Sequence, residues 1–149
     1  MSINKYVSEV KTIEHNEQVV FNYLSNFENL SGYLNSGLIE KITKQVPQVK
    51  ITDFQSDRDS CKFNITGMGV AEVKIVKREP FKTIKVESSG NLPLSFTFWI
   101  QLIPVDSFKT KMRLTLHADL SMMIKMMVGN KLGEGINQLA ETLSKLPYK

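Results

Sequence analysis

His15, His117 and Cys61 are the side chains of this sequence that most readily support acid–base, nucleophilic or metal chemistry. Neither histidine belongs to a metal-ligand motif, and both are expected outside the apolar face, one in a turn and one on the polar face of a strand. Cys61 alternates with Phe63 and Ile65, without a base beside it, and is therefore predicted to be a buried, unreactive side chain. The sequence thus predicts no metal site and no catalytic residue.

A few hydroxyl side chains on inward-facing positions remain candidates for acid–base work. Two interpretations stay open for them: catalysis, or hydrogen bonds to the backbone in or near the core, which is the commoner role. The candidates are Tyr6, Ser8, Thr12 and Tyr23.

Composition and charge limit the class of protein. The 149 residues, 42% hydrophobic and 9% aromatic, fit one compact domain spanning residues 1–149. The single cysteine excludes an intramolecular disulfide framework, the start MSINKYVSEV lacks the apolar core of a signal peptide, and no apolar run is long enough to cross a bilayer. We therefore expect a cytoplasmic protein without a transmembrane segment.

Neither nucleic acid nor a cofactor is an expected partner. The net charge of +4 comes mostly from scattered lysines, and glutamates interrupt the densest basic stretch, residues 74–85. The segment Gly67-Met68-Gly69 lacks the spacing, the Lys-Ser/Thr pair and the helix start of a phosphate-binding loop, so it is interpreted as a strand connection.

The hydrophobic pattern predicts an α+β fold. Helical spacing indicates a helix over 17–28, capped by Asn16, and a second short helix from Leu38 to Val46 that ends at Pro47. A long helix over 122–146 is expected to lie across the concave side of the sheet. Alternation with period two predicts seven antiparallel strands, at 4–13, 49–55, 60–66, 70–78, 83–88, 94–103 and 110–120.

Alternation also assigns the two faces of the sheet. The side chains predicted to face inward are apolar: Phe63, Ile65, Phe96, Phe98, Ile100, Met112, Leu114 and Leu116. Trp99 falls on the opposite face, where it is either half-covered at a sheet edge or part of a protein contact.

Four stretches of the chain resemble small bacterial members of the SRPBCC superfamily, which includes START domains, polyketide cyclases and dehydrases, coenzyme Q-binding proteins and birch-pollen-allergen-like proteins. They are EHNEQVVFNYLSNFENL, CKFNITGMGVAEVKIV, LSFTFWIQL and ADLSMMIKMMVGNKL. The resemblance covers nearly the whole chain and agrees with a helix-grip fold, in which the sheet wraps around the long C-terminal helix. It implies a hydrophobic cavity between the sheet and that helix, used across the superfamily to hold apolar molecules.

Three functions are compatible with such a cavity. The favoured hypothesis is a non-catalytic carrier or sensor for a small hydrophobic molecule, of lipid, quinone, sterol or polyketide-like type. A cyclase- or dehydrase-type enzyme and an interaction module whose cavity is filled by its own side chains are the alternatives. The last helix is expected to contribute Met126, Gly129, Leu132, Gly133 and Ile136 to the lining, beside the inward strand residues.

The stretch SMMIKMMVGNKLGEG, residues 121–135, is unusual for a helix because its three glycines together cost roughly 3 kcal/mol of helix stability. A bend near Gly129 accounts for it and places the methionines over one mouth of the cavity as a gate. Equally, the methionines fill core or form a subunit contact, which would make the protein a homodimer. Gly133 and Gly135 are expected to let the helix approach the sheet or a bound molecule closely.

Overall fold

The computed structural model describes residues 3–29, 51–65, 69–90, 94–120, 132–146 and 148. Within these ranges the chain forms one antiparallel sheet of eight strands, accompanied by two helices of eight residues or more and by a helical stretch at residues 27–29. The strands are β1 (Ile3–Val7), β2 (Lys11–Ile13), β3 (Ile51–Ser56), β4 (Ser60–Ile65), β5 (Gly69–Glu79), β6 (Thr83–Gly90), β7 (Leu94–Asp106) and β8 (Lys109–Leu120), and the helices are α1 (Glu17–Leu24) and α5 (Leu132–Ser144).

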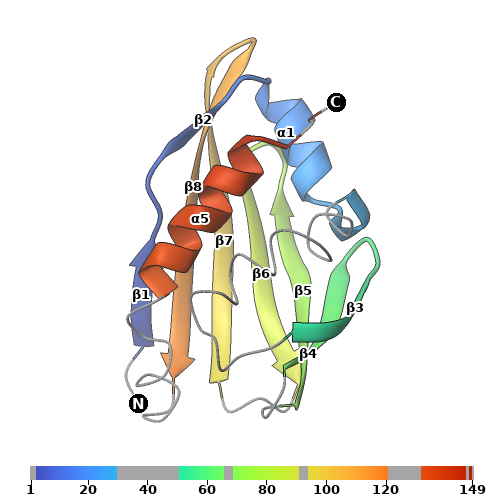
Figure 1. The fold of residues 1–149 in the computed structure, drawn as a ribbon. Coiled ribbons are helices and arrows are strands. Elements are labelled where there is room, and N and C mark those ends of the chain that lie inside the picture. Colours follow the sequence, from blue (N-terminus) through green and yellow to red (C-terminus); the bar gives the residue numbers. More distant parts are fainter. Residues whose placement is uncertain are drawn as a thin grey trace.

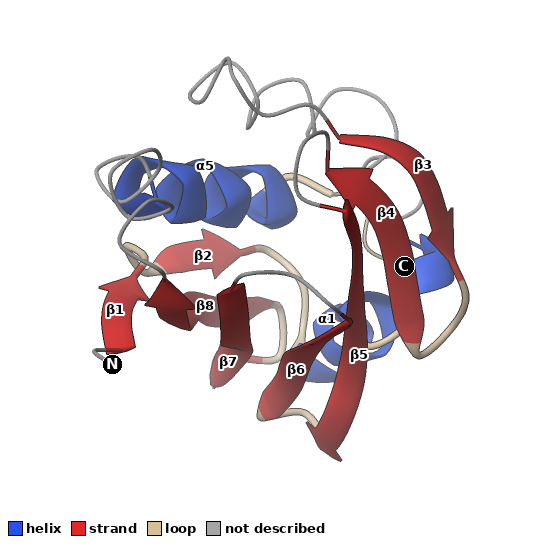
Figure 2. Cartoon of the chain, turned by 90° about the horizontal axis from the view of Figure 1, so that it is seen from below, coloured by secondary structure: helices blue, strands red, loops and turns tan. Residues whose placement is uncertain are grey.

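The sheet is strongly curved and holds both helices on its concave side. Its strand order is β1-β8-β7-β6-β5-β4-β3, and β2 also pairs with β8. α5 crosses the sheet over β1, β2 and β8, whereas α1 sits at one end of the concave face (Figures 1 and 2). The predicted α+β helix-grip class is therefore confirmed. The second predicted helix, from Leu38 to Val46, and the start of the long C-terminal helix lie outside the described residues.

The helix α1 begins where the sequence predicts but ends earlier. Asn16 caps it, because its side-chain oxygen accepts a hydrogen bond of 2.9 Å from the Val19 amide. The helix ends at Leu24 rather than at residue 28, and residues 27–29 form a separate helical stretch after a break at 25 and 26. The Arg78 guanidinium donates to the carbonyl of Ser25, the C-cap residue, at 2.7 and 3.2 Å. A cation at this position interacts favourably with the partial negative charge at the C-terminal end of the helix. The contact also ties α1 to β5.

The first predicted strand, 4–13, is divided in two by a bulge. Val7 pairs with Thr115 and Lys11 pairs with Met112, so that residues 8–10 stand opposite only two residues of β8. The extra residue reverses the alternation, which leaves Thr12 exposed. The prediction that Thr12 faces inward is therefore wrong.

Ser8 makes this bulge possible without leaving a buried amide unpaired. Its backbone amide donates to the Leu114 carbonyl at 2.8 Å, and its hydroxyl oxygen accepts from the Leu114 amide at 2.9 Å. The same hydroxyl donates to the Glu9 carbonyl at 2.9 Å. The Ser8 hydroxyl is thus fully hydrogen-bonded to the backbone. Of its two interpretations, the structural role is therefore favoured over catalysis.

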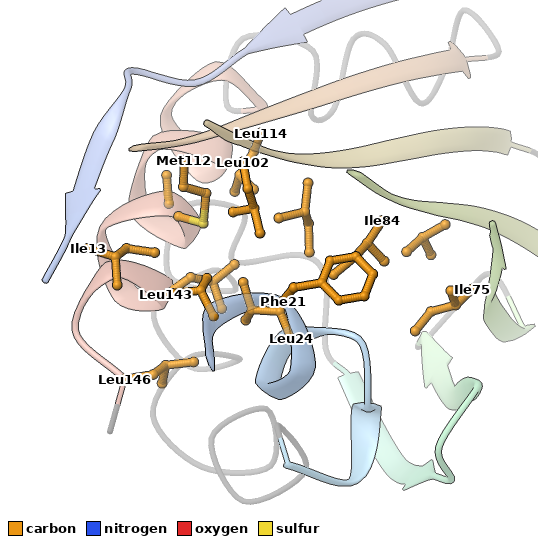
Figure 3. Close-up of a cluster of buried hydrophobic side chains, with 14 of the residues drawn as sticks. Ile13, Phe21, Leu24, Ile75, Ile84, Leu102, Met112, Leu114, Leu143 and Leu146 are labelled. Atoms are coloured by element: carbon orange, nitrogen blue, oxygen red, sulfur yellow. The ribbon is translucent and has the colours of Figure 1, made fainter. Parts of the chain in front are cut away.

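The packed part of the core lies between α1, the C-terminal half of α5 and the adjoining ends of the strands. Side chains from all three meet there, as Figure 3 shows. The residues labelled in that view are Ile13, Phe21, Leu24, Ile75, Ile84, Leu102, Met112, Leu114, Leu143 and Leu146.

Replacing Ser8 by alanine should lower the free energy of unfolding by about 1–2 kcal/mol, because the buried Leu114 amide loses its acceptor. Urea unfolding measures the change. Ser95→Ala is the matched control, since Ser95 is exposed on β7, and it should change stability by less than about 0.5 kcal/mol. Equal effects of the two substitutions would contradict the assigned role.

Candidate ligand-binding site

The inward face of β7 and β8 changes from packed to accessible along its length. Ile100 pairs in register with Leu114, and both are buried, with 4% and 0% of their surface exposed. The next inward pair, Phe98 and Leu116, is only half-buried, and so is Phe96 beyond it, whereas Ala118, which pairs with Phe96, is again buried with 2% of its surface exposed. Phe96, Phe98 and Leu116 therefore form a continuous apolar wall with accessible surface, which we call the apolar wall.

The packed end is closed by α1 and by Tyr148, which follows α5. The Tyr148 ring lies 5.1 Å from the ring of Tyr23 and 5.6 Å from that of His15, centroid to centroid. Its hydroxyl donates to the Leu143 carbonyl of α5. Burial raises the pKa of the Tyr148 phenol, so the group stays a neutral donor. These contacts pack α1 against the end of α5 at one end of the concave face.

The first turn of α5 leaves room on the side that faces the sheet. Gly133 precedes Ile136 by three residues and Ala140 by seven, so the three share one side of the helix, and both larger residues are buried. Apart from its chain neighbours and the backbone of its own helix, a Cβ atom built on Gly133 meets no atom of the described residues within 4 Å, and the same holds for Gly135. Among the described residues the helix therefore does not approach the sheet closely at these glycines, so this part of the expectation is wrong, whereas a close approach to a bound molecule stays a prediction.

The structure separates the predicted lining residues into two sets. The half-buried ones are Phe63, Phe96, Phe98, Leu116, Leu132 and Gly133. The buried ones, which have almost no surface for a ligand to touch, are Ile100, Met112, Leu114 and Ile136. The side chain of Ile65, together with Met126 and Gly129 and hence the proposed methionine gate, lies outside what the structure describes.

Two further half-buried side chains face the same way and were not predicted as lining. Tyr6 pairs in register with Leu116, and Leu139 lies on α5; both pack against the core. Both positions could have been predicted from the sequence, Tyr6 from the alternation along β1 and Leu139 from the row of leucines in the last helix. Asn4, on the same face of β1 as Tyr6, has a buried side-chain amide nitrogen without a hydrogen-bond partner.

In the described part of the chain, the side chains that could support acid–base, nucleophilic or metal chemistry do not form a catalytic arrangement. The His15 carbonyl accepts from the Thr110 hydroxyl at 2.8 Å, and the Tyr23 hydroxyl donates to the Asn29 carbonyl at 3.3 Å. No cluster of three or more His, Cys, Asp or Glu side chains that could hold a metal occurs among the described residues. Nor does any helix in those ranges have the length and apolar character needed to span a membrane.

Trp99 and His117 lie together on the outer face of the sheet. Their ring centroids are 4.6 Å apart in an edge-to-face arrangement, and the Lys85 ammonium lies 5.9 Å from the Trp99 ring. The predicted outward orientation of both is confirmed. The sheet-edge interpretation of Trp99 is wrong, because β7 lies between β6 and β8.

Comparison with known proteins identifies the fold. No protein-family model and no curated protein matches the sequence. Norcoclaurine synthase from Thalictrum flavum superimposes with a TM-score of 0.63 at 11% identity, covering 97% of this chain and 86% of that one. The chain has an SRPBCC-type fold.

Two bacterial structures agree with this assignment. A START superfamily protein from Mycobacterium smegmatis matches with a TM-score of 0.55 at 10% identity, over 96% of this chain and 97% of that one. A protein from Thermus thermophilus matches with a TM-score of 0.57 at 12% identity, over 95% of each chain. Identities this low establish the fold and leave function to be argued from the site.

Cys61 should be unreactive in the folded protein. Burial, with smaller contributions from the Asp57 and Glu72 carboxylates, raises the pKa of its thiol to about 12. A disulfide reagent at pH 8 should therefore modify the unfolded chain rapidly and the native chain hardly at all.

The same shift fixes a pH dependence of stability. The protonated Cys61 thiol contributes to the free energy of unfolding because its pKa is higher in the folded than in the unfolded chain. This stabilisation is fully present below the pKa of an unfolded cysteine, near 8.5, and is lost as the pH rises toward about 12. The Cys61→Ala variant should lose less stability than the native protein over this alkaline range. Modification of the native protein as fast as of the unfolded chain would contradict the assignment.

Proposed function

We propose that the protein is a cytoplasmic, non-catalytic carrier or sensor that holds a small hydrophobic molecule against the apolar wall, beneath the first turn of α5. One observation supports the proposal above all: Phe96, Phe98 and Leu116 keep accessible surface on a concave face whose adjacent layer, Ile100 and Leu114, is fully packed. The open space beside Gly133 lies on the opposing helix. Concave, mostly apolar and largely preformed surfaces are typical of small-molecule sites.

The absence of a reactive group on this face favours binding over catalysis. Inward strand positions with described side chains carry no carboxylate and no imidazole. Ser8 is committed to the backbone, and the Cys61 thiol, with its pKa near 12, is protonated at neutral pH. Acid–base catalysis requires a group that exchanges a proton near the working pH. The described part of the face therefore supports retention of a molecule rather than its conversion.

The ligand should be mainly apolar with one polar group. Norcoclaurine synthase, which shares the fold, has been solved in complex with dopamine and hydroxybenzaldehyde. In this chain the unpartnered Asn4 amide lies on the same face of β1 as Tyr6 and can donate to a carbonyl or carboxylate oxygen. Fatty acids, quinones and related lipids have this combination. Burial of about ten methylenes, reduced by ordering and association costs, predicts dissociation constants near the micromolar range or weaker.

Gly133→Leu should reduce ligand affinity at least about tenfold without loss of stability, because the new side chain occupies the space beneath α5 and leucine favours a helix more than glycine. A panel of fatty acids, sterols, quinones and aromatic polyketides, scored by the rise in melting temperature, first identifies a ligand; titration then compares the variants.

Gly135→Leu is the matched control. The same substitution enters equally open space, but Gly135 lies about 100° around the helix from Ile136, away from the side that holds Ile136 and Ala140. Its affinity should stay within about threefold of the native value. The proposal fails if no compound of the panel raises the melting temperature, or if the two leucine variants lose affinity equally. Turnover of a panel compound would favour the enzyme alternative.

A further inference from the structure

The hairpin that joins β7 to β8 ends in an exposed aromatic residue. The connecting turn is Ser107 and Phe108, and 77% of the Phe108 surface is exposed. Figure 1 shows the hairpin extending well past α1 and α5 at its end of the molecule. Turn positions normally carry Gly, Asn, Asp, Pro or Ser, so a phenylalanine here exposes apolar surface that the turn itself does not require.

Other apolar side chains extend this exposed surface along the outer face of the sheet. Ile103 and Val105 alternate on β7 and expose 65% and 50% of their surface. Val10, also exposed, borders a shallow hollow with Ile103 and Arg113. We call Val10, Ile103, Val105 and Phe108 the tip patch. Exposed apolar residues gathered in one place, unlike scattered ones, indicate an interaction surface.

Three cations flank the tip patch on the neighbouring strand. Lys109, Lys111 and Arg113 are exposed at alternate positions of β8, and Lys111 pairs in register with Ile103. No ion pair involves any of the three in the described ranges, whereas lysines elsewhere, such as Lys74 and Lys77, contact carboxylates.

The single acidic residue between 103 and 113 leaves this positive charge in excess. That residue is Asp106, whose carboxylate accepts a hydrogen bond of 2.7 Å from the Phe108 amide and so holds the turn in shape. Within residues 103–113, three cations against one carboxylate give a net positive charge. Two further carboxylates lie beside the tip patch: Glu9, next to Val10, pairs with Lys11 at 3.5 Å, and Glu17 of α1 shares a hollow with Val105 and Asp106.

We propose that the tip patch docks on the surface of an anionic lipid bilayer. Phe108 enters the boundary between headgroups and acyl chains, Ile103 and Val105 follow it, and the basic side chains remain with the anionic headgroups. This pattern of apolar side chains bordered by cations matches the layers of such a membrane. A second copy of the chain fits less well, because self-association through this patch brings like charges together. The proposal concerns a different surface from the apolar wall and does not depend on what binds there.

Flotation with lipid vesicles tests the proposal on the full chain. The protein should bind vesicles of phosphatidylcholine and phosphatidylserine mixed at about three to one, hardly bind phosphatidylcholine alone, and dissociate as the salt concentration rises. Phe108→Ser, and the double variant Lys109→Gln with Lys111→Gln, should each reduce the partition coefficient at least about tenfold. All three positions are exposed, so melting temperatures should not change.

Two matched controls separate the tip from the rest of the surface. Val76→Ser removes an exposed apolar side chain on β5, with 50% of its surface exposed against 77% for Phe108, and Lys74→Gln with Lys77→Gln removes the same net charge there. Both should bind within about twofold of the native protein. If the Lys109/Lys111 and Lys74/Lys77 double variants lost vesicle binding equally, net charge alone would explain the binding, and the proposal would be overturned. So would absence of vesicle binding, including the case in which sedimentation shows a dimer that Phe108→Ser dissociates.

Discussion

In the described part of the chain, the helices α1 and α5 lie on the concave face of a strongly curved sheet, and their position relative to the strands determines which inward side chains they bury. Alternation along β7 and β8 directs a long row of apolar side chains inward. α1, with α5 and Tyr148, covers one end of the row and buries Ile100 and Leu114. Further along, Phe96, Phe98 and Leu116 keep accessible surface, so site and core are parts of one continuous apolar face.

The arrangement depends on local devices that hold the helices at the packed end. Asn16 caps the start of α1, and the Arg78 guanidinium binds the carbonyl of its C-cap residue, Ser25, and the Asp59 carboxylate, the latter at 2.6 Å. Ser8 supplies the acceptor that the bulge between β1 and β2 removes from Leu114. These polar groups form hydrogen bonds with the backbone, and the described part of the concave face is lined mainly by apolar side chains. On the strands, the inward positions with described side chains carry no carboxylate and no imidazole.

The sequence predicted those features that follow from periodicity and missed those that follow from a single contact. Period-two alternation was sufficient to place Phe98 inward and Trp99 outward, and the order of elements was sufficient for the helix-grip class. The bulge at Ser8 was not visible, because it depends on one side chain pairing with a strand more than a hundred residues away. Likewise, alternation cannot distinguish Ile100 from Phe98, since only the position of α1 decides which is covered.

Intermolecular nuclear Overhauser effects between a bound fatty acid and the protein report directly which side chains touch the ligand. The account predicts contacts from the acyl chain to the ring protons of Phe96 and Phe98 and to the Leu116 methyl groups, with none to buried Leu114. Contacts confined to exposed residues such as Ile103 and Phe108, without any to the apolar wall, would contradict it.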